Sequence, residues 1–477
     1  MSIGSVLSSA RLALQAQTTA METASHNIAN ATVEGYSRQR VDLQPNVPLY
    51  TPWGAVGTGV VVANIQRVRD TMLDTSYRSQ ASQSGQYATR RDLLTRIGNV
   101  FGEPSESGLS STLDQFWSAW GDLANSPTST AAKSVVQQRG SQLASALNRF
   151  SGDMDGVAAS ASEQVTTQVN LLNRYASQIA GLNQTIVAAE SGGQSANDIR
   201  DMRDRALDEM NKIAPVRMLE EPNGAATVYM SGISIVDGVT TKQLSLDHSG
   251  ASLLLKVAGQ ASSIGSPGGS LGAALGVINT DVPKAKAQLD DLAAGIVAKI
   301  NAVHRTGWTG AGDALGGANW DATAPPTGSN VDFFDSSKTT AGTISLSTAV
   351  ASNGAYIAAG DVQNATGNNS VASAVATVRR DTDVILKSGS STLTTSFGEY
   401  YRDLVTRVGV DTSDADSSAT VYETLTQQAD AQRQSVSGVS TDDELIEMTK
   451  RQQAYSAAAK VITAANDMSQ TLLDMIR

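Results

Sequence analysis

Residues 3–30 read IGSVLSSARLALQAQTTAMETASHNIAN, and this stretch decides the fold. Apolar and small side chains recur in it at alternating spacings of four and three, which predicts one long amphipathic helix of the coiled-coil kind. Its large apolar members are Ile3, Leu7, Leu14, Met21 and Ile28. These are few for a helix of this length, so burying them repays little of the backbone entropy that ordering costs.

The last residues of the chain repeat the pattern. Ser440 and Thr441, followed by Asp443 and Glu444, predict the start of a second long helix. Its stripe contains large apolar residues diluted by polar ones: Leu445, Met448, Gln452, Tyr455, Ala459, Ile462, Asn466, Ser469, Leu473 and Ile476. We therefore expect both ends to be disordered in an isolated subunit and to fold as they pack against other chains.

Between the two ends the hydrophobic period changes several times. Short strands and turns are expected at about 38–68, helices from about 69 to 214, and period-two alternation with Asn-Gly and Asp-Gly turns at 215–269. Helical spacing returns at 270–305. We interpret 306–370 as strands and loops, and expect helices from Val371 to the end.

These patterns predict a mainly α fold with β inserts. We expect an elongated, multi-domain molecule with antiparallel terminal coiled-coil helices, an α-helical bundle and a small antiparallel β domain. The expected parts are a terminal helical domain (1–36 and 438–477), a helical rod (37–214, 270–305 and 371–437, with a short β segment near 38–68) and a β-rich outer insert (215–269 and 306–370). The termini would meet at one pole, with the β inserts at the other.

Composition excludes several classes of function. The net charge of −11 argues against a nucleic-acid partner, which needs a basic face. The chain has no cysteine, three scattered histidines and 5 % aromatic residues, a poor supply for metal sites, cysteine nucleophiles or aromatic-lined pockets. We expect no cofactor, no metal site and no catalytic site.

Sequence motifs point the same way. HExxH, GxSxG and P-loop patterns are absent, and Gly54, Gly57 and Gly59 lack the strand-to-helix context of a dinucleotide fingerprint. No stretch approaches 18 apolar residues, so no membrane span is expected. The N-terminal region is too polar for a cleaved signal peptide. These features indicate a scaffold rather than an enzyme.

Two stretches resemble the terminal signatures of the flagellar axial proteins. They are NIANATVEGYSRQR at 27–40 and GVSTDDELIEMTKRQQAYSAAAKVITAANDMSQTLL at 438–473. GYSRQ, together with the segments 127–150, 177–210 and 268–307, is similar to the hook–filament junction members of that family. The resemblance implies a structural subunit outside the cell, in the flagellum, exported through the type III channel without a cleaved leader.

The properties of particular side chains, together with the resemblance to the flagellar axial proteins, indicate which residues could form an assembly interface. Asn27 and Asn30 can bond free backbone groups at a helix end, Gly35 permits a positive φ, and Tyr36 places its ring where helix meets strand. The full set is Ile3, Leu7, Leu14, Met21, Asn27, Ile28, Asn30, Gly35, Tyr36, Leu445, Met448, Gln453, Tyr455, Ile462, Leu473 and Ile476. The implied partners are further copies of the chain, the hook protein, the second junction protein, the filament cap and an export chaperone on the C-terminal helix.

Other functions stay open at this point. The nearest alternative is another axial protein of the hook or rod type. A type III secreted effector or a wall hydrolase with polymer-like ends would need a pair of carboxylates in a cleft. A membrane-active translocator would need more positive charge along the helix stripes.

Overall fold

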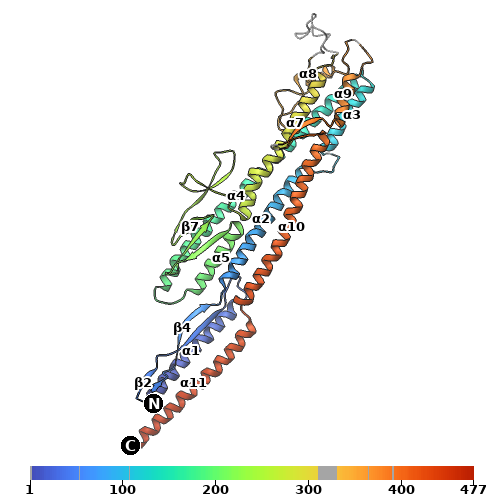
Figure 1. Ribbon diagram of the computed structural model, residues 1–477. Coiled ribbons are helices and arrows are strands. Elements are labelled where there is room, and N and C mark those ends of the chain that lie inside the picture. Colours follow the sequence, from blue (N-terminus) through green and yellow to red (C-terminus); the bar gives the residue numbers. More distant parts are fainter. Residues whose placement is uncertain are drawn as a thin grey trace.

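The computed structural model describes residues 3–476, apart from residues 53, 107, 310–329, 364, 389 and 390. The molecule is elongated, and both chain ends lie at one pole (Figure 1). Long helices dominate it, and the strands form small antiparallel sheets. The predicted fold class, mainly α with β inserts, is confirmed.

The pole that holds both termini is built from two helices and a β ribbon. Helix α1 (Ile3–Asn30) and helix α11 (Thr441–Ile476) run antiparallel, because the C-terminal turns of α1 contact the first turn of α11. Beside them, β1 (Gln39–Pro45) pairs with β4 (Val60–Arg67), and the ribbon ends in β2 (Leu49–Thr51) and β3 (Gly54–Val56). We call this part the terminal pole.

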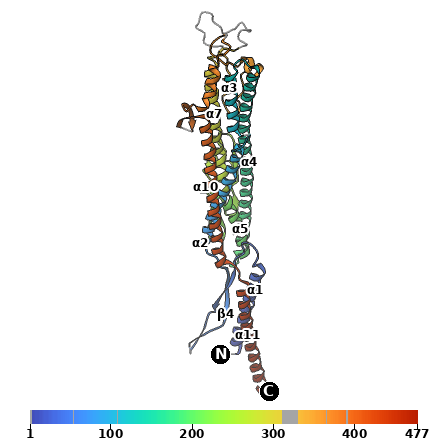
Figure 2. The same ribbon diagram turned by 90° about the vertical axis from the view of Figure 1, so that its right-hand side faces the viewer.

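A helical rod extends from the terminal pole to the far end of the molecule (Figure 2). Its elements are α2 (Thr71–Phe101), α3 (Leu109–Asn125), α4 (Thr130–Glu190), α5 (Asn197–Ile213), α6 (Gly269–Gly276), the π-helical turn η1 (Val277–Asp281), α7 (Val282–His304) and α10 (Phe397–Ser437). Helices α2 and α10 lie antiparallel, with Tyr87 stacked on Tyr422. At about 1.5 Å per residue, the 61 residues of α4 span roughly 90 Å.

Local chemistry fixes where these helices begin and end. Asp70 accepts hydrogen bonds from the first turn of α2, and Gly102 ends that helix in the left-handed conformation. Ser396 and Glu399 form a capping box at the start of α10. The predicted apolar face of 109–123 is entirely buried in the rod core: Leu109, Leu113, Phe116, Trp117, Trp120 and Leu123.

The larger sheets lie beside the rod. Strands β5 (Val216–Glu220), β6 (Ala226–Met230), β7 (Ile233–Asp237) and β8 (Thr240–Thr241) form one sheet, and β9 (Leu244–Asp247), β10 (Leu254–Val257) and β11 (Ser263–Ile264) form another. Asn183 on α4 binds the carbonyls of Ala226 and Gly238, and Arg203 on α5 binds the carbonyl of Gly224. The expectation that these strands sit at the far pole is therefore wrong, because α4 and α5 hold them along the rod (Figure 1).

Two segments near the far end differ from the expected secondary structure. In 306–370 the described residues contain the short helix α8 (Thr348–Ser352), the 3-10 turn η2 (Gly354–Tyr356) and two isolated β-bridges in place of the expected strands. After α9 (Ser370–Thr377) and the 3-10 turn η3 (Val378–Arg380), a hairpin of β12 (Val384–Ser388) and β13 (Ser391–Thr395) interrupts the expected run of helices. Val384 and Leu386 alternate into the core, a period-two signal too short to stand out in the sequence. The three-domain partition stays a prediction.

Candidate assembly interface

Where α1 and α11 lie side by side, the apolar side chains that the described residues of both helices bury are all small. Helix α1 buries Ala10, Ala16, Ala20 and Ala24, and the only apolar side chain that α11 buries among its described residues is Ala465. Alanines let two helix backbones approach closely, but each removes little apolar surface from water. We call this contact the seam. It joins the two helices without forming a large hydrophobic core.

The large apolar residues predicted for α1 are only partly covered in the single chain. Ile3, Leu7, Leu14, Met21 and Ile28 are all half-buried in the single chain. On α11, Met448 and Ile462 are half-buried as well, whereas Leu445, Gln453, Tyr455 and Leu473 are exposed. The side chain of Ile476 lies outside the described residues. The role of these residues in assembly stays a prediction.

Helix α11 also carries a second apolar stripe next to the seam. Val461, Met468, Leu472 and Met475 follow one another at spacings of seven, four and three, so they share one helix face. The exposed fraction of these four residues ranges from 45 % for Val461 to 77 % for Met475. We call these four residues the outer stripe. Stripes of this size on a soluble helix mark sites of protein contact.

The motif at residues 27–40 closes the corner where the terminal pole meets the rod. Asn27 is buried, and its amide nitrogen donates to the Gln39 carbonyl at 2.9 Å and to Glu444 at 3.1 Å. Its amide oxygen accepts from the backbone N–H of Gln39 at 2.9 Å and from the Tyr36 hydroxyl at 2.8 Å. One side chain thus connects α1, β1 and α11.

Neighbouring residues complete the corner. Asn30 donates to the carbonyl of His26, and Gly35 has φ +74°, as the turn requires. A Cβ at Gly35 would lie 2.3 Å from Cγ of Arg205. The Tyr36 ring packs edge-on against His26. Burial is the main cause that raises the pKa of the Tyr36 hydroxyl, and the negative charge of the nearby Asp198 carboxylate raises it further. The hydroxyl therefore keeps its proton and can donate a hydrogen bond.

Behind this corner lies a cluster of ion pairs that the sequence analysis did not identify. Three arginines, from the end of β4, from the connection to α2 and from α2 itself, meet three aspartates of α5, and α10 contributes a fourth arginine. We call these residues the charged joint: Arg67, Arg69, Arg78, Asp201, Asp204, Asp208 and Arg433. The only signal in the sequence was the density of Asp and Arg in the segment DIRDMRDRALDEM.

The geometry of the charged joint is tight. Arg67 lies 2.7 Å from both Asp201 and Asp204, and Arg69 lies 2.9 Å from Asp204. Asp201 also accepts hydrogen bonds from the backbone N–H and the hydroxyl of Ser37, both at 2.8 Å. Burial alone would raise the pKa of Asp204, but the guanidinium groups of Arg69, Arg67 and Arg78 outweigh it and lower that pKa to about 2. The joint therefore fixes the terminal pole to the rod through charges.

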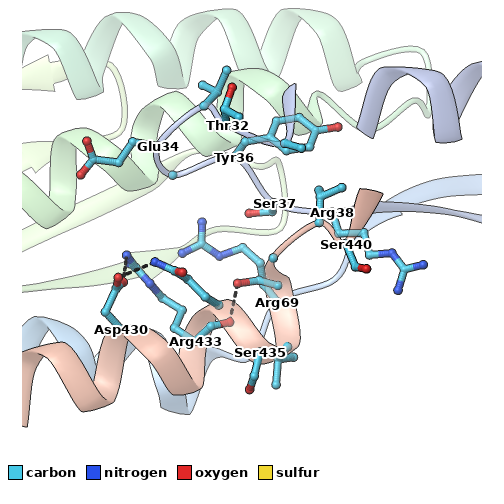
Figure 3. Close-up of a pocket in the computed structure, with 18 of the residues that line it drawn as sticks. Thr32, Glu34, Tyr36, Ser37, Arg38, Arg69, Asp430, Arg433, Ser435 and Ser440 are labelled. Atoms are coloured by element: carbon cyan, nitrogen blue, oxygen red, sulfur yellow. Dashed lines mark hydrogen bonds and ion pairs between the residues drawn. The ribbon is translucent and has the colours of Figure 1, made fainter. Parts of the chain in front are cut away.

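A groove of about 700 Å³ opens beside the joint (Figure 3). One wall is the turn that holds Thr32, Glu34 and Tyr36, and the other is the end of α10 with the turn into α11. Arg433 pairs with Asp430 and lies over the Tyr77 ring at 3.9 Å. Arg433 and Asp430 of this wall are thus already paired with each other.

Neither a metal-ligating cluster nor a membrane-spanning helix is found among the described residues. These residues contain no group of three or more His, Asp or Glu side chains placed so that it could hold a metal ion. Within the same ranges, no helix has the length and the apolar character that crossing a bilayer requires. What the arrangement provides is a rigid rod, a joint and a terminal pole with uncovered apolar faces.

Comparison with known proteins first defines the class. The sequence-family model of the flagella basal body rod protein matches residues 7–36. The family model of the C-terminal region of the flagellar basal body rod proteins FlgEFG matches residues 426–475. These two segments contain most of α1 and α11. The terminal pole is therefore of the flagellar axial class. Between them, the model of the flagellar hook-associated protein FlgK helical domain matches residues 94–319.

Full-length relatives then define the family. Flagellar hook-associated protein 1 of Bacillus subtilis is 30 % identical, over 98 % of this chain and 97 % of the relative. The proteins of the same name from Salmonella typhimurium and Escherichia coli are 26 % and 25 % identical, each over 99 % of this chain and 100 % of the relative. The chain belongs to the flagellar hook-associated protein 1 family, whose members are structural proteins of the flagellum at the hook–filament junction.

A solved structure shows the same fold. The flagellar hook junction protein FlgK from Burkholderia pseudomallei superposes with a TM-score of 0.61 at 17 % identity. The match covers 76 % of this chain and all of that one. The expected resemblance to junction members of the axial family is thus confirmed.

Proposed function

We propose that this subunit joins the hook to the filament by polymerising through α1 and α11. The observation that carries the proposal is the mismatch between the single apolar residue that α11 buries in its described part and the many large apolar residues that it exposes. The exposed large apolar residues are Leu445, Ile446, Tyr455, Val461, Met468, Leu472, Leu473 and Met475. Helices of neighbouring subunits would cover these side chains, which the seam leaves in water.

The position of the two helices suits a tubular polymer. Both lie at one pole and are tied to the rod by the charged joint, so the seam has a fixed direction relative to the rod. Subunits that meet through unlike faces form an open helical array rather than a closed dimer. In our proposal α1 and α11 line the inner tube, and the rod lies outside it.

The partners in this proposal follow from the same surfaces. Further copies of the chain would contact α1 and α11 laterally. The hook protein would contact them on one side of the junction, the second junction protein on the other, and the filament cap during assembly. An export chaperone would cover the outer stripe before export, since exposed apolar helix faces promote aggregation.

The proposal also states where the subunit acts and that it catalyses no reaction. The subunit would be delivered outside the cell through the flagellar export channel, without a cleaved leader, and would have no enzymatic activity. The structural relatives at nearly full length support a purely structural role.

Charge placed on the outer stripe tests the proposal. Met468→Asp and Leu472→Asp alter exposed residues outside the seam, so the monomer should melt as the wild type does. Ser456→Asp and Thr463→Asp add the same charge at exposed polar positions of α11 and serve as controls. In a strain lacking the chromosomal copy, we expect hooks without filaments and flagellin shed into the medium for the stripe variants only. Normal filaments in both stripe variants would contradict the proposal.

A further inference from the structure

The ribbon at the terminal pole ends in an exposed and uncharged tip. The sequence has no charged residue between Asp42 and Arg67. Within this stretch Val47 is 78 % exposed, Leu49 59 % and Tyr50 81 %. We call these three residues the ribbon tip. A surface segment without charge and with an exposed aromatic ring has the composition of a protein interface.

The ribbon tip has little support within its own chain. Among the described residues, strands β2 and β3 pair only with each other, over three residues each, and a hairpin of this size is marginal in water. Figure 2 shows the ribbon leaning away from the α1–α11 pair, so its far end is directed outward. A second surface that covered the tip would both bury its apolar side chains and fix the hairpin.

A surface of matching character lies on the same pole. A groove of about 550 Å³ runs between α1, β4 and α11. Leu12 and Leu14 line it from α1, Val61 from β4 and Tyr455 from α11. Its charged residues are Arg11 and Glu22. We call it the terminal groove. Two of its residues, Leu14 and Tyr455, are among those predicted from sequence for assembly.

The tip and the groove of one molecule are unlike surfaces at different places. Val60–Val62 of the same ribbon form part of the groove wall, so the tip could enter its own groove only by folding the ribbon back on itself. A tip that enters the groove of another copy makes a heterologous contact, and such contacts propagate from subunit to subunit into a ring or an open helical array, rather than ending at a two-fold dimer.

We propose that the ribbon tip of one subunit seats in the terminal groove of a second copy of this chain. This inference rests on the proposed polymerisation and specifies one of its lateral contacts. Tyr50 and Leu49 would meet Leu12, Leu14 and Tyr455 across the boundary between subunits. Uncharged apolar side chains of the tip would meet the apolar residues of a groove that also holds Arg11 and Glu22, and a charge on the ribbon would have to be buried in this contact.

Cysteine cross-linking tests the contact, and the natural chain, which has no cysteine, gives no background. Tyr50→Cys in one tagged copy and Thr18→Cys, at the groove, in a differently tagged copy are expressed together in a strain lacking the chromosomal gene. After oxidation of isolated flagella, we expect a disulfide dimer that carries both tags. Gln44→Cys, exposed on the same ribbon but outside the tip, replaces Tyr50→Cys as the control and should give at least tenfold less dimer.

Two results would overturn the inference. One is that both cysteine variants are incorporated into flagella but form no mixed dimer. The other is that Tyr50→Cys links to a different protein, or to Thr18→Cys within a single doubly substituted chain.

A charge at the tip gives an independent measurement. Tyr50→Glu should reduce the number of hooks bearing filaments at least tenfold, whereas Gln44→Glu should leave it unchanged, and both should fold normally because both positions are exposed. Normal filaments with Tyr50→Glu would refute the contact. The proposed function would still stand if the outer-stripe variants failed to assemble, so the two failures are distinguishable.

Discussion

Asp204 is the residue whose removal should most weaken the attachment of the terminal pole to the rod. Its carboxylate is buried and lies within 2.9 Å of Arg67 and Arg69. The lowering of its pKa from 3.8 to about 2 corresponds to about 2 kcal/mol in favour of the charged form. Asp204→Asn removes this charge and leaves half-paired guanidinium groups, so we expect a loss of about 3–5 kcal/mol in the free energy of unfolding.

Urea denaturation followed by circular dichroism measures this loss. Because the folded pKa lies below the unfolded one, the stabilisation is complete above about pH 4 and disappears as the pH falls towards 2. The difference between wild type and Asp204→Asn should therefore shrink over that range. Asp442→Asn changes an exposed carboxylate and should have little effect. A loss below about 1 kcal/mol at pH 7 for Asp204→Asn would refute the role assigned to the joint.

Two further predictions concern the corner and the far end. Gly35→Ala should destabilise the corner by about 1–2 kcal/mol from its positive φ alone, and further through contact with Arg205. In the double variant with Arg205→Ala, only the loss of stability caused by the contact with Arg205 should be recovered. Urea denaturation measures the free energy of unfolding of both variants. His304 accepts a hydrogen bond from the N–H of Ala358, and burial lowers its pKa from 6.5 to about 4. Stability should therefore be complete above about pH 6.5 and fall by about 3 kcal/mol towards pH 4, and this fall should be absent in His304→Gln.

Equal stability of Gly35→Ala and wild type would contradict the conformational argument for the corner. An identical pH dependence in His304→Gln and wild type would show that other groups, and not this imidazole, control the acid response.

The sequence predicted best what local periodicity controls. The face from Leu109 to Leu123 and both terminal helices depend on residues three and four apart, and these were found where expected. The residues that α11 buries in the seam agree less well with the sequence prediction. Helix α11 buries Glu444 and Ala465 there, whereas the strict pattern of large residues selected Leu445 and Leu473, which are exposed. Helices that pack through small side chains show only a weak hydrophobic periodicity in the sequence, because alanine differs little in hydropathy from its neighbours.

The charged joint could not be predicted because its members are far apart in the chain. Ser37, Arg67 and Asp201 meet only after the ribbon has folded against α5. The position of the sheets likewise depends on two buried polar residues, Asn183 and Arg203, whose partners are backbone carbonyls. Nothing in hydropathy distinguishes such residues from solvated ones.

Amide hydrogen exchange on the free subunit and on the same subunit within isolated flagella tests the central claim most directly. If α1 and α11 depend on neighbouring subunits for their order beyond the corner at Asn27 and Glu444, their amides there should exchange rapidly in the free protein and become protected in the flagellum, while α3 and the core of α4 are protected in both. Strong protection along α1 and α11 in the free subunit would contradict the claim, because the seam alone would then hold the terminal pole together.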